Sequence, residues 1–126
     1  MTFALWFLQF LLAGAFGVIG YGHAFTFDRL ASQPRTAWMT AVGRQRMRAI
    51  GILEILGAIG LILPAATGIL PWLTPLAASA FVLLMAFAIV FHARRPGEGP
   101  NIAFNVVLGL LALAVAIGRF VIEPLS

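Results

Sequence analysis

The sequence contains no cysteine, no lysine and few charged residues of any kind. Without cysteine, the chain cannot form disulfides, thiolate metal sites or iron–sulfur clusters, and it cannot perform thiol redox catalysis. Charged residues make up 10% of its 126 residues, eight arginines against four acids, and hydrophobic residues make up 62%. An average soluble domain is about a quarter charged. The composition therefore predicts an integral membrane protein with one domain over residues 1–126, and it fits nucleic-acid binding poorly.

Four apolar runs are long enough to cross a hydrocarbon core of ~30 Å, which takes about 20 helical residues. They cover residues 3–22, 49–70, 72–92 and 102–122. Pro64 interrupts the second run, so its helix either continues past the proline with a kink or ends there in a re-entrant turn. We expect an all-α fold, an integral membrane four-helix bundle with an amphipathic interfacial segment between the first two helices.

The charged residues concentrate in two of the three connections. Residues 23–48 contain five arginines and one aspartate, and the third connection contains Arg94, Arg95 and Glu98. The connection between the second and third runs has no charge. The positive-inside rule then places the first and third connections in the cytoplasm and both termini outside, although Arg119 near the other end opposes this orientation.

The first connection is too long for a simple turn. Residues 37–48 alternate apolar side chains with Arg44, Arg46 and Arg48, a pattern typical of a short amphipathic helix at the membrane surface. We expect these three arginines to contact lipid headgroups. The alternative is a solvated basic loop that only sets the orientation.

Polar residues inside the apolar runs predict a common site. Glu54 lies about five residues inside the second run, where a charged carboxylate is costly unless it is protonated or paired. Because successive helices alternate in direction, polar residues from all four runs should meet at the end of the bundle nearest the first and third connections. The residues expected at this level are His23, Glu54, His92, Asn101 and Asn105, with Tyr21 at the border.

Each of these residues also has a purely structural interpretation. The two histidines are suited to contacts at the membrane surface, Asn101 follows Pro100 and is suited to capping a helix, and Glu54 is suited to pairing with an Arg or Asn. The functional interpretation is a pocket that binds a polar headgroup or handles protons, with Glu54 and His92 as the proton-handling candidates. Two histidines and a glutamate are also metal ligands, but no supporting motif accompanies them, so we expect no metal site.

Several segments resemble the DoxX-like family of small membrane proteins. They are the Gly-rich run 51–64 with Glu54 and Pro64, the segments 70–77 and 91–95, Asn101 near the start of the fourth run and the pair Gly118–Arg119. The resemblance covers most of residues 48–120, whereas the first run and the first connection match only in character. It implies a four-helix protein of the bacterial inner membrane, with Glu54 as the family's recurrent acid and His92 as its recurrent histidine.

The family takes its name from a relative associated with quinone-coupled thiosulfate oxidation, and some members are described as partners of redox or stress-response proteins. The resemblance therefore implies a protein that binds a quinone or a lipid, or that serves as the membrane partner of a redox system. It leaves open whether the chain catalyses a reaction. The alternatives are a structural subunit of a larger membrane complex or homo-oligomer and, less favoured, a small transporter.

Overall fold

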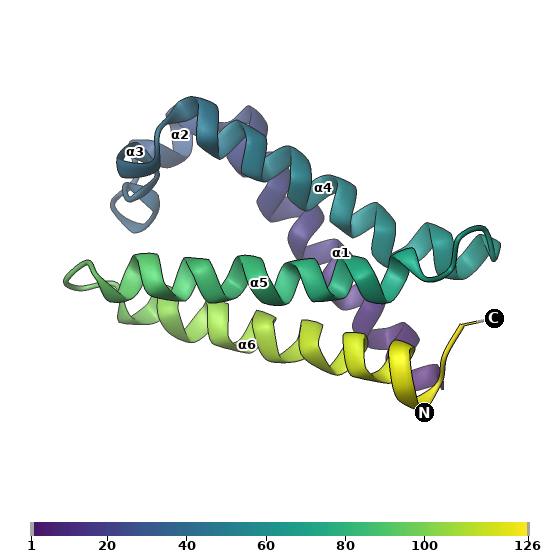
Figure 1. Ribbon diagram of the computed structural model, residues 1–126. Coiled ribbons are helices and arrows are strands. Elements are labelled where there is room, and N and C mark those ends of the chain that lie inside the picture. Colours follow the sequence, from purple (N-terminus) through teal and green to yellow (C-terminus); the bar gives the residue numbers. More distant parts are fainter. Residues whose placement is uncertain (1, 126) are drawn as a thin grey trace.

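The computed structural model describes residues 2–125 and consists of helices (Figure 1). Four of them are long and apolar enough to span a membrane: α1 (Thr2–Phe25), α4 (Arg44–Thr67), α5 (Leu73–Ala93), and α6 (Gly99–Ile117) with its continuation η2 (Gly118–Ile122). Three short helices, α2 (Phe27–Ala31), η1 (Pro34–Thr36) and α3 (Met39–Val42), join α1 to α4. The predicted all-α four-helix bundle is confirmed.

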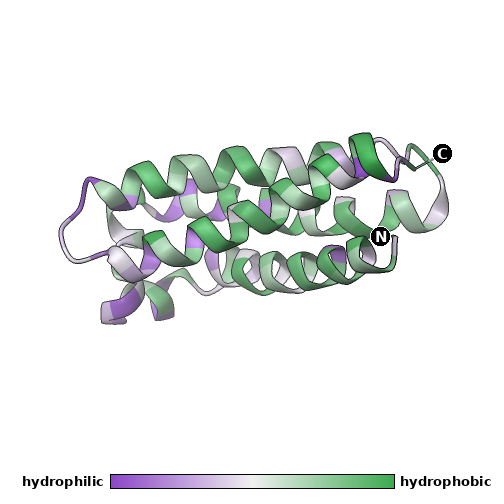
Figure 2. Cartoon of the chain, turned by 90° about the horizontal axis from the view of Figure 1, so that it is seen from below, coloured by the Kyte–Doolittle hydropathy of each residue, from purple (hydrophilic) through white to green (hydrophobic). Residues whose placement is uncertain are grey.

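The bundle consists of two helix pairs, α1 with α4 and α5 with α6 (Figure 1). Both termini and the α4–α5 connection lie at one end, here called the terminal end. The short helices and the α5–α6 connection lie at the other, here called the loop end. Most hydrophilic residues gather at the loop end, whereas the long helices are mainly hydrophobic (Figure 2).

Each long helix buries one face, on which small and polar residues lie among larger apolar ones. The centre of the core contains Phe16 of α1 stacked on Phe81 of α5, with ring centroids 3.8 Å apart. Gly57 of α4 leaves the space for the Phe81 ring, because a methyl group at Gly57 would lie 2.5 Å from it. The outward faces expose large apolar residues such as Phe3, Val18 and Phe87, as expected for surfaces that contact lipid.

α1 and α4 approach each other most closely where two glycines meet. A β-carbon at Gly51 would lie 2.5 Å from the carbonyl oxygen of Gly20, and one at Gly20 would lie 2.7 Å from the carbonyl oxygen of Gly51. Small residues allow such backbone contact between helices in a membrane, where van der Waals packing replaces the hydrophobic effect as the driving force.

Helix α4 continues through Pro64 to Thr67, which decides between the two alternatives left open by the sequence. A proline inside a helix has no N–H, so the carbonyl four residues earlier, that of Gly60, loses its helical donor. The Thr74 hydroxyl of α5 donates to that carbonyl at 2.9 Å. The helix ends at Gly68, whose φ of 72° is left-handed and suits glycine.

The connection between the first two long helices differs from the sequence-based expectation. Residues 37–48 do not form one amphipathic helix, because the chain turns at Gly43, with a φ of 97°, between α3 and α4. Arg44, Arg46 and Arg48 therefore lie in the first turns of α4, which begins five residues before the apolar run at position 49. A helix needs no apolar side chains to start, so hydropathy underestimates its length.

We predict that Gly51→Ala lowers the stability of the bundle by about 1–3 kcal/mol, because its methyl group overpacks the α1–α4 contact. Thermal unfolding in mild detergent measures the effect. Gly14→Ala on α1 is the matched control, since a β-carbon there meets nothing within 4 Å. Equal stability of the two variants would show that the close approach of Gly20 and Gly51 is not needed.

Candidate functional site

A cavity of about 690 Å³ lies at the loop end, between the two helix pairs and beneath the short helices. Its volume falls within the ~300–1,000 Å³ typical of small-molecule sites. Its walls are mainly apolar and aromatic, and polar side chains from all four long helices reach it. Those polar residues are His23 of α1, Glu54 of α4, His92 of α5, and Asn101 and Asn105 of α6.

Glu54 is the deepest acid in the bundle, with 2% of its surface exposed. It lies ten residues into α4, about 15 Å along the helix axis. Its Oε1 lies 2.6 Å from Nδ1 of His23, in the last turn of α1. Side chains lean toward the N-terminus of their helix, and the two helices run in opposite directions, so Glu54 and His23 lean toward each other.

An isolated carboxylate inside a membrane is costly, and a hydrogen-bonded partner lowers that cost. His23 is such a partner for Glu54. This arrangement supports the interpretation of Glu54 as a paired residue, with His23 as its partner rather than an Arg or Asn.

A second histidine–carboxylate pair lies on the α5–α6 side. Nδ1 of His92 lies 2.5 Å from Oε1 of Glu98, and Arg95 donates from Nε to the other oxygen of Glu98 at 2.7 Å. Burial alone would raise the pKa of Glu98, but the hydrogen bonds from His92 and Arg95 outweigh it, so its pKa lies below the usual value. Glu98 is therefore ionised at neutral pH, and because a carboxylate can only accept, Nδ1 of His92 is the donor of their hydrogen bond.

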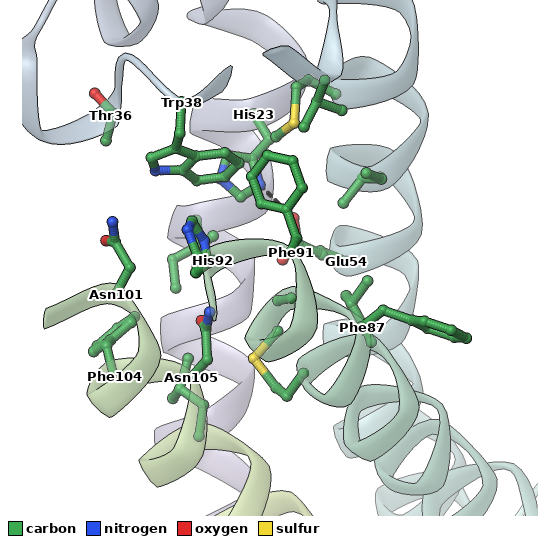
Figure 3. A pocket seen from close by; sticks show the side chains of 18 of the residues that line it. His23, Thr36, Trp38, Glu54, Phe87, Phe91, His92, Asn101, Phe104 and Asn105 are labelled. Atoms are coloured by element: carbon green, nitrogen blue, oxygen red, sulfur yellow. Dashed lines mark hydrogen bonds and ion pairs between the residues drawn. The ribbon is translucent and has the colours of Figure 1, made fainter. Parts of the chain in front are cut away.

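Trp38 separates the two histidines, as Figure 3 shows. Its ring meets that of His92 edge-on at a centroid distance of 4.8 Å and that of His23 at 5.8 Å. Trp38 directly precedes α3, so the connection between α1 and α4 folds over part of the loop end of the cavity.

The two asparagines occupy the α6 side of the cavity (Figure 3). Asn105 is 9% exposed and lines the cavity together with Asn101. Asn101 does not cap α6, because the helix begins at Gly99 and Asn101 is already inside its first turn. Each amide has both donor and acceptor atoms that it can offer to a molecule in the cavity.

The structure thus brings together His23, Glu54, His92, Asn101 and Asn105, as the alternation of helix directions predicts. Tyr21 is not with them, because it is 57% exposed and its ring packs beside Phe25 on the outward face of α1.

The predicted headgroup arginines divide between two places. Arg46 lines the cavity, as does Arg35 of η1, which the sequence analysis did not single out. Arg44 is hydrogen-bonded to Asp28 and lines a separate depression together with Arg48. The hydrogen bond from Arg44 lowers the pKa of Asp28.

Sequence reasoning missed Trp38 and Glu98 at this site. Trp38 lies in the segment 37–48, for which the sequence predicts an amphipathic helix, and Glu98 lies in the third connection, where its charge bears on the orientation. The sequence does contain a signal for Glu98, because Gly97 in the short segment Arg94–Gly97 favours a turn. Its φ of 79° lets the chain fold back, so that Glu98 contacts His92. Among residues 2–125, no three His, Asp or Glu side chains are grouped closely enough to hold a metal ion.

A second buried polar cluster, also missed, lies at the terminal end. Gln9 of α1 donates to the carbonyl of Leu61 in α4 at 2.7 Å and accepts from Nε of Arg119 at 2.7 Å. The Arg119 guanidinium, in a side chain that is 3% exposed, lies 5.4 Å from the centre of the Trp6 ring. The cluster joins α1, α4 and η2 without an acidic side chain.

Comparison with protein families identifies the relationship. A model of the DoxX-like family matches residues 7–115. The chain belongs to the DoxX-like family. The match extends the resemblance noted in the sequence into the first helix, and it includes every polar residue of the cavity. Comparisons with the curated proteins and with the solved structures give no match. The chain is thus a DoxX-like membrane protein with four candidate membrane-spanning helices.

The lowered pKa of Glu98 predicts an acid-sensitive loop end in this DoxX-like protein. A carboxyl whose pKa is lower in the folded than in the unfolded protein stabilises the fold above its unfolded pKa, about 4.3 for glutamate. That stability is lost as the pH falls through the folded pKa. We expect the melting temperature to fall between pH 5 and pH 3, approximately, and to fall less steeply in Glu98→Gln.

Thermal unfolding followed by circular dichroism across this pH range measures the effect. Asp28, whose pKa is also lowered, accounts for the dependence that remains in the variant. Glu123→Gln is the control, because Glu123 lies at the terminal end. If Glu98→Gln and wild type show the same slope, Glu98 does not stabilise the loop end through its ionised form.

Proposed function

We propose that this DoxX-like protein binds a membrane-soluble molecule with a polar head, a quinone or a lipid, in the loop-end cavity. The observation that supports the proposal most directly is the combination of a 690 Å³ cavity with polar side chains that reach it from all four long helices. The Asn105 amide and the His92 ring are among these groups. They place hydrogen-bonding atoms beside an otherwise apolar space, the composition typical of small-molecule sites.

The residues present suit a quinone. The Asn105 amide can donate to a quinone oxygen, and the ring nitrogen of His92 that does not face Glu98 can accept from a hydroxyl of the reduced form. Phe16, Trp38 and Phe104 offer apolar and aromatic surface. Quinone reduction takes up protons as well as electrons, and the two histidine–carboxylate pairs are positioned to exchange protons with a ligand in the cavity. His92 and the partly exposed Glu98 form a hydrogen-bonded pair that leads from the cavity toward the surface, which is a route for such a proton, and Arg95 holds Glu98 in place.

The electrons would come from another protein. The chain has no cysteine, so it has no thiol with which to relay them. We therefore assign the protein the role of a ligand-binding membrane partner of a redox system, and not that of a complete oxidoreductase. The chain's own contribution is to bind, to orient and to exchange protons.

We expect Glu54→Gln and His92→Ala each to weaken binding of a short-tailed quinone analogue at least tenfold, and Asn105→Leu to do so while preserving side-chain size. Each substitution removes a proton-exchanging or hydrogen-bonding group from the cavity. Equilibrium binding to protein in lipid nanodiscs measures this. Tyr21→Phe, outside the cavity, is the matched control.

Native mass spectrometry of protein extracted with its lipids identifies any bound molecule and the number of chains. A bound mass that disappears in all three cavity variants supports the proposal. Unchanged ligand content in Glu54→Gln and His92→Ala would contradict it. A chain that carries no ligand but associates into stable oligomers would instead support the structural-subunit alternative.

We propose that the loop end faces the cytoplasm of a bacterial inner membrane and the terminal end faces outward. Arginines outnumber acids in the two loop-end connections, and the terminal-end arginine, Arg119, is buried among Gln9 and Trp6 rather than presented to lipid headgroups. Arg119 therefore counts less against this orientation than the sequence alone suggests.

The natural absence of cysteine makes this orientation easy to test. We expect Ser32→Cys at the loop end to react with a membrane-impermeant maleimide only in inside-out vesicles. Thr67→Cys at the terminal end should react in intact cells, since both positions are exposed. Labelling in the opposite pattern would reverse the orientation, and labelling of both positions from one side would contradict a four-span topology.

A further inference from the structure

Two arginines that line the cavity have no acidic partner among the described residues, because each of the four acidic residues either pairs with another side chain or lies at the opposite end of the bundle. Asp28 is paired with Arg44, Glu54 with His23, and Glu98 with His92 and Arg95. Glu123 lies at the opposite end of the bundle, beyond η2. Arg35 and Arg46 therefore have no acidic partner among residues 2–125, although both line the cavity.

The cavity changes in character along its depth. Arg35 and Arg46 are exposed and line it where η1 and the first turn of α4 bound it at the loop end. The two histidine–carboxylate pairs and Trp38 lie at the next level. Phe16, Met85 and Leu108 lie about two helical turns or more farther from the loop end, and all three are buried apolar side chains. Positive charge at the opening is thus followed by polar groups and then by an apolar interior.

From this gradient we infer that the physiological occupant is a single-chain amphiphile with an anionic head, a phosphate or a carboxylate, held at Arg35 and Arg46. Its chain extends past Trp38 toward Phe16, Met85 and Leu108. Guanidinium groups bind both anions through paired, charge-assisted hydrogen bonds. The volume of about 690 Å³ suits one chain rather than a whole two-chain lipid. The inference rests on the proposed ligand-binding function and narrows it to one ligand class.

The test uses three probes with the same brominated C18 chain: a carboxylate, a monoalkyl phosphate and a neutral alcohol. Bromine quenches tryptophan fluorescence on contact, and Trp38 lines the cavity. The chain has three tryptophans, so Trp6→Phe and Trp72→Phe leave Trp38 as the reporter. The protein is placed in nanodiscs of zwitterionic phosphatidylcholine, and the same titrations on a variant that also carries Trp38→Phe give the background.

We expect the carboxylate and phosphate probes to quench Trp38 at concentrations at least tenfold lower than the alcohol. The double variant Arg35→Gln, Arg46→Gln should lose most of that preference. The matched control is Arg29→Gln, Arg48→Gln, which changes the net charge equally but lies at the other loop-end depression. It should keep the preference. A difference between the two anionic probes identifies whether a phosphate or a carboxylate is the better head.

Equal binding of the alcohol and the anions would overturn the inference while leaving a ligand-binding cavity. An equal loss of preference in the control variant would also overturn it, because the effect would then be one of surface charge in general. No quenching of Trp38 by any probe would also overturn the inference, and it would contradict the proposed function as well if the quinone analogue does not bind either. Both arginine pairs are exposed, so the melting temperatures of the double variants should match that of the parent and exclude misfolding as a cause.

Discussion

The close contact of Gly20 and Gly51 is the constraint on which the loop end depends. It brings the backbones of α1 and α4 together at a point where no larger side chain fits. Glu54 follows Gly51 by one turn, and a β-carbon at Gly20 would lie 3.0 Å from that of Glu54. The carboxylate is therefore held within reach of His23, and the pair removes an isolated charge from the apolar interior. Without this helix contact, Glu54 would face lipid or an unpaired cavity wall.

The two helix pairs are joined chiefly at the terminal end, which explains why the cavity lies at the other. Two side-chain hydrogen bonds connect α1 or α4 with α5 or η2: Thr74 to the Gly60 carbonyl, and Arg119 to Gln9. Both lie toward the terminal end. At the loop end, each histidine–carboxylate pair stays within its own helix pair, and the Trp38 ring meets His23 of one helix pair and His92 of the other. The cavity lies at this end, between the two helix pairs.

Much of the site could be predicted from sequence, because alternating helix directions place His23, Glu54, His92 and Asn105 at one level whatever the details of packing. Tyr21 was wrongly included, since a residue two positions from His23 points to another face of a helix with 3.6 residues per turn. The contributions of Trp38 and Glu98 depend on backbone turns at Gly43 and Gly97, whose geometry hydropathy does not encode. Arg119 was missed because its partner Gln9 is 110 residues away and neutral.

The distribution of charge follows a consistent physical logic from the surface inward. Arginines without acidic partners stay exposed at the loop end, where water and lipid headgroups solvate them. At the level of the cavity, Glu54 and Glu98 are each paired with a histidine. Deeper still, the Phe16–Phe81 stack closes the interior with apolar surface. The proposed amphiphile, aligned in the same direction as the surrounding lipids, would meet groups of matching polarity at every depth. Its head would then lie in the leaflet that the basic connections face, so the orientation proposed for the protein and that proposed for the ligand depend on the same arginines.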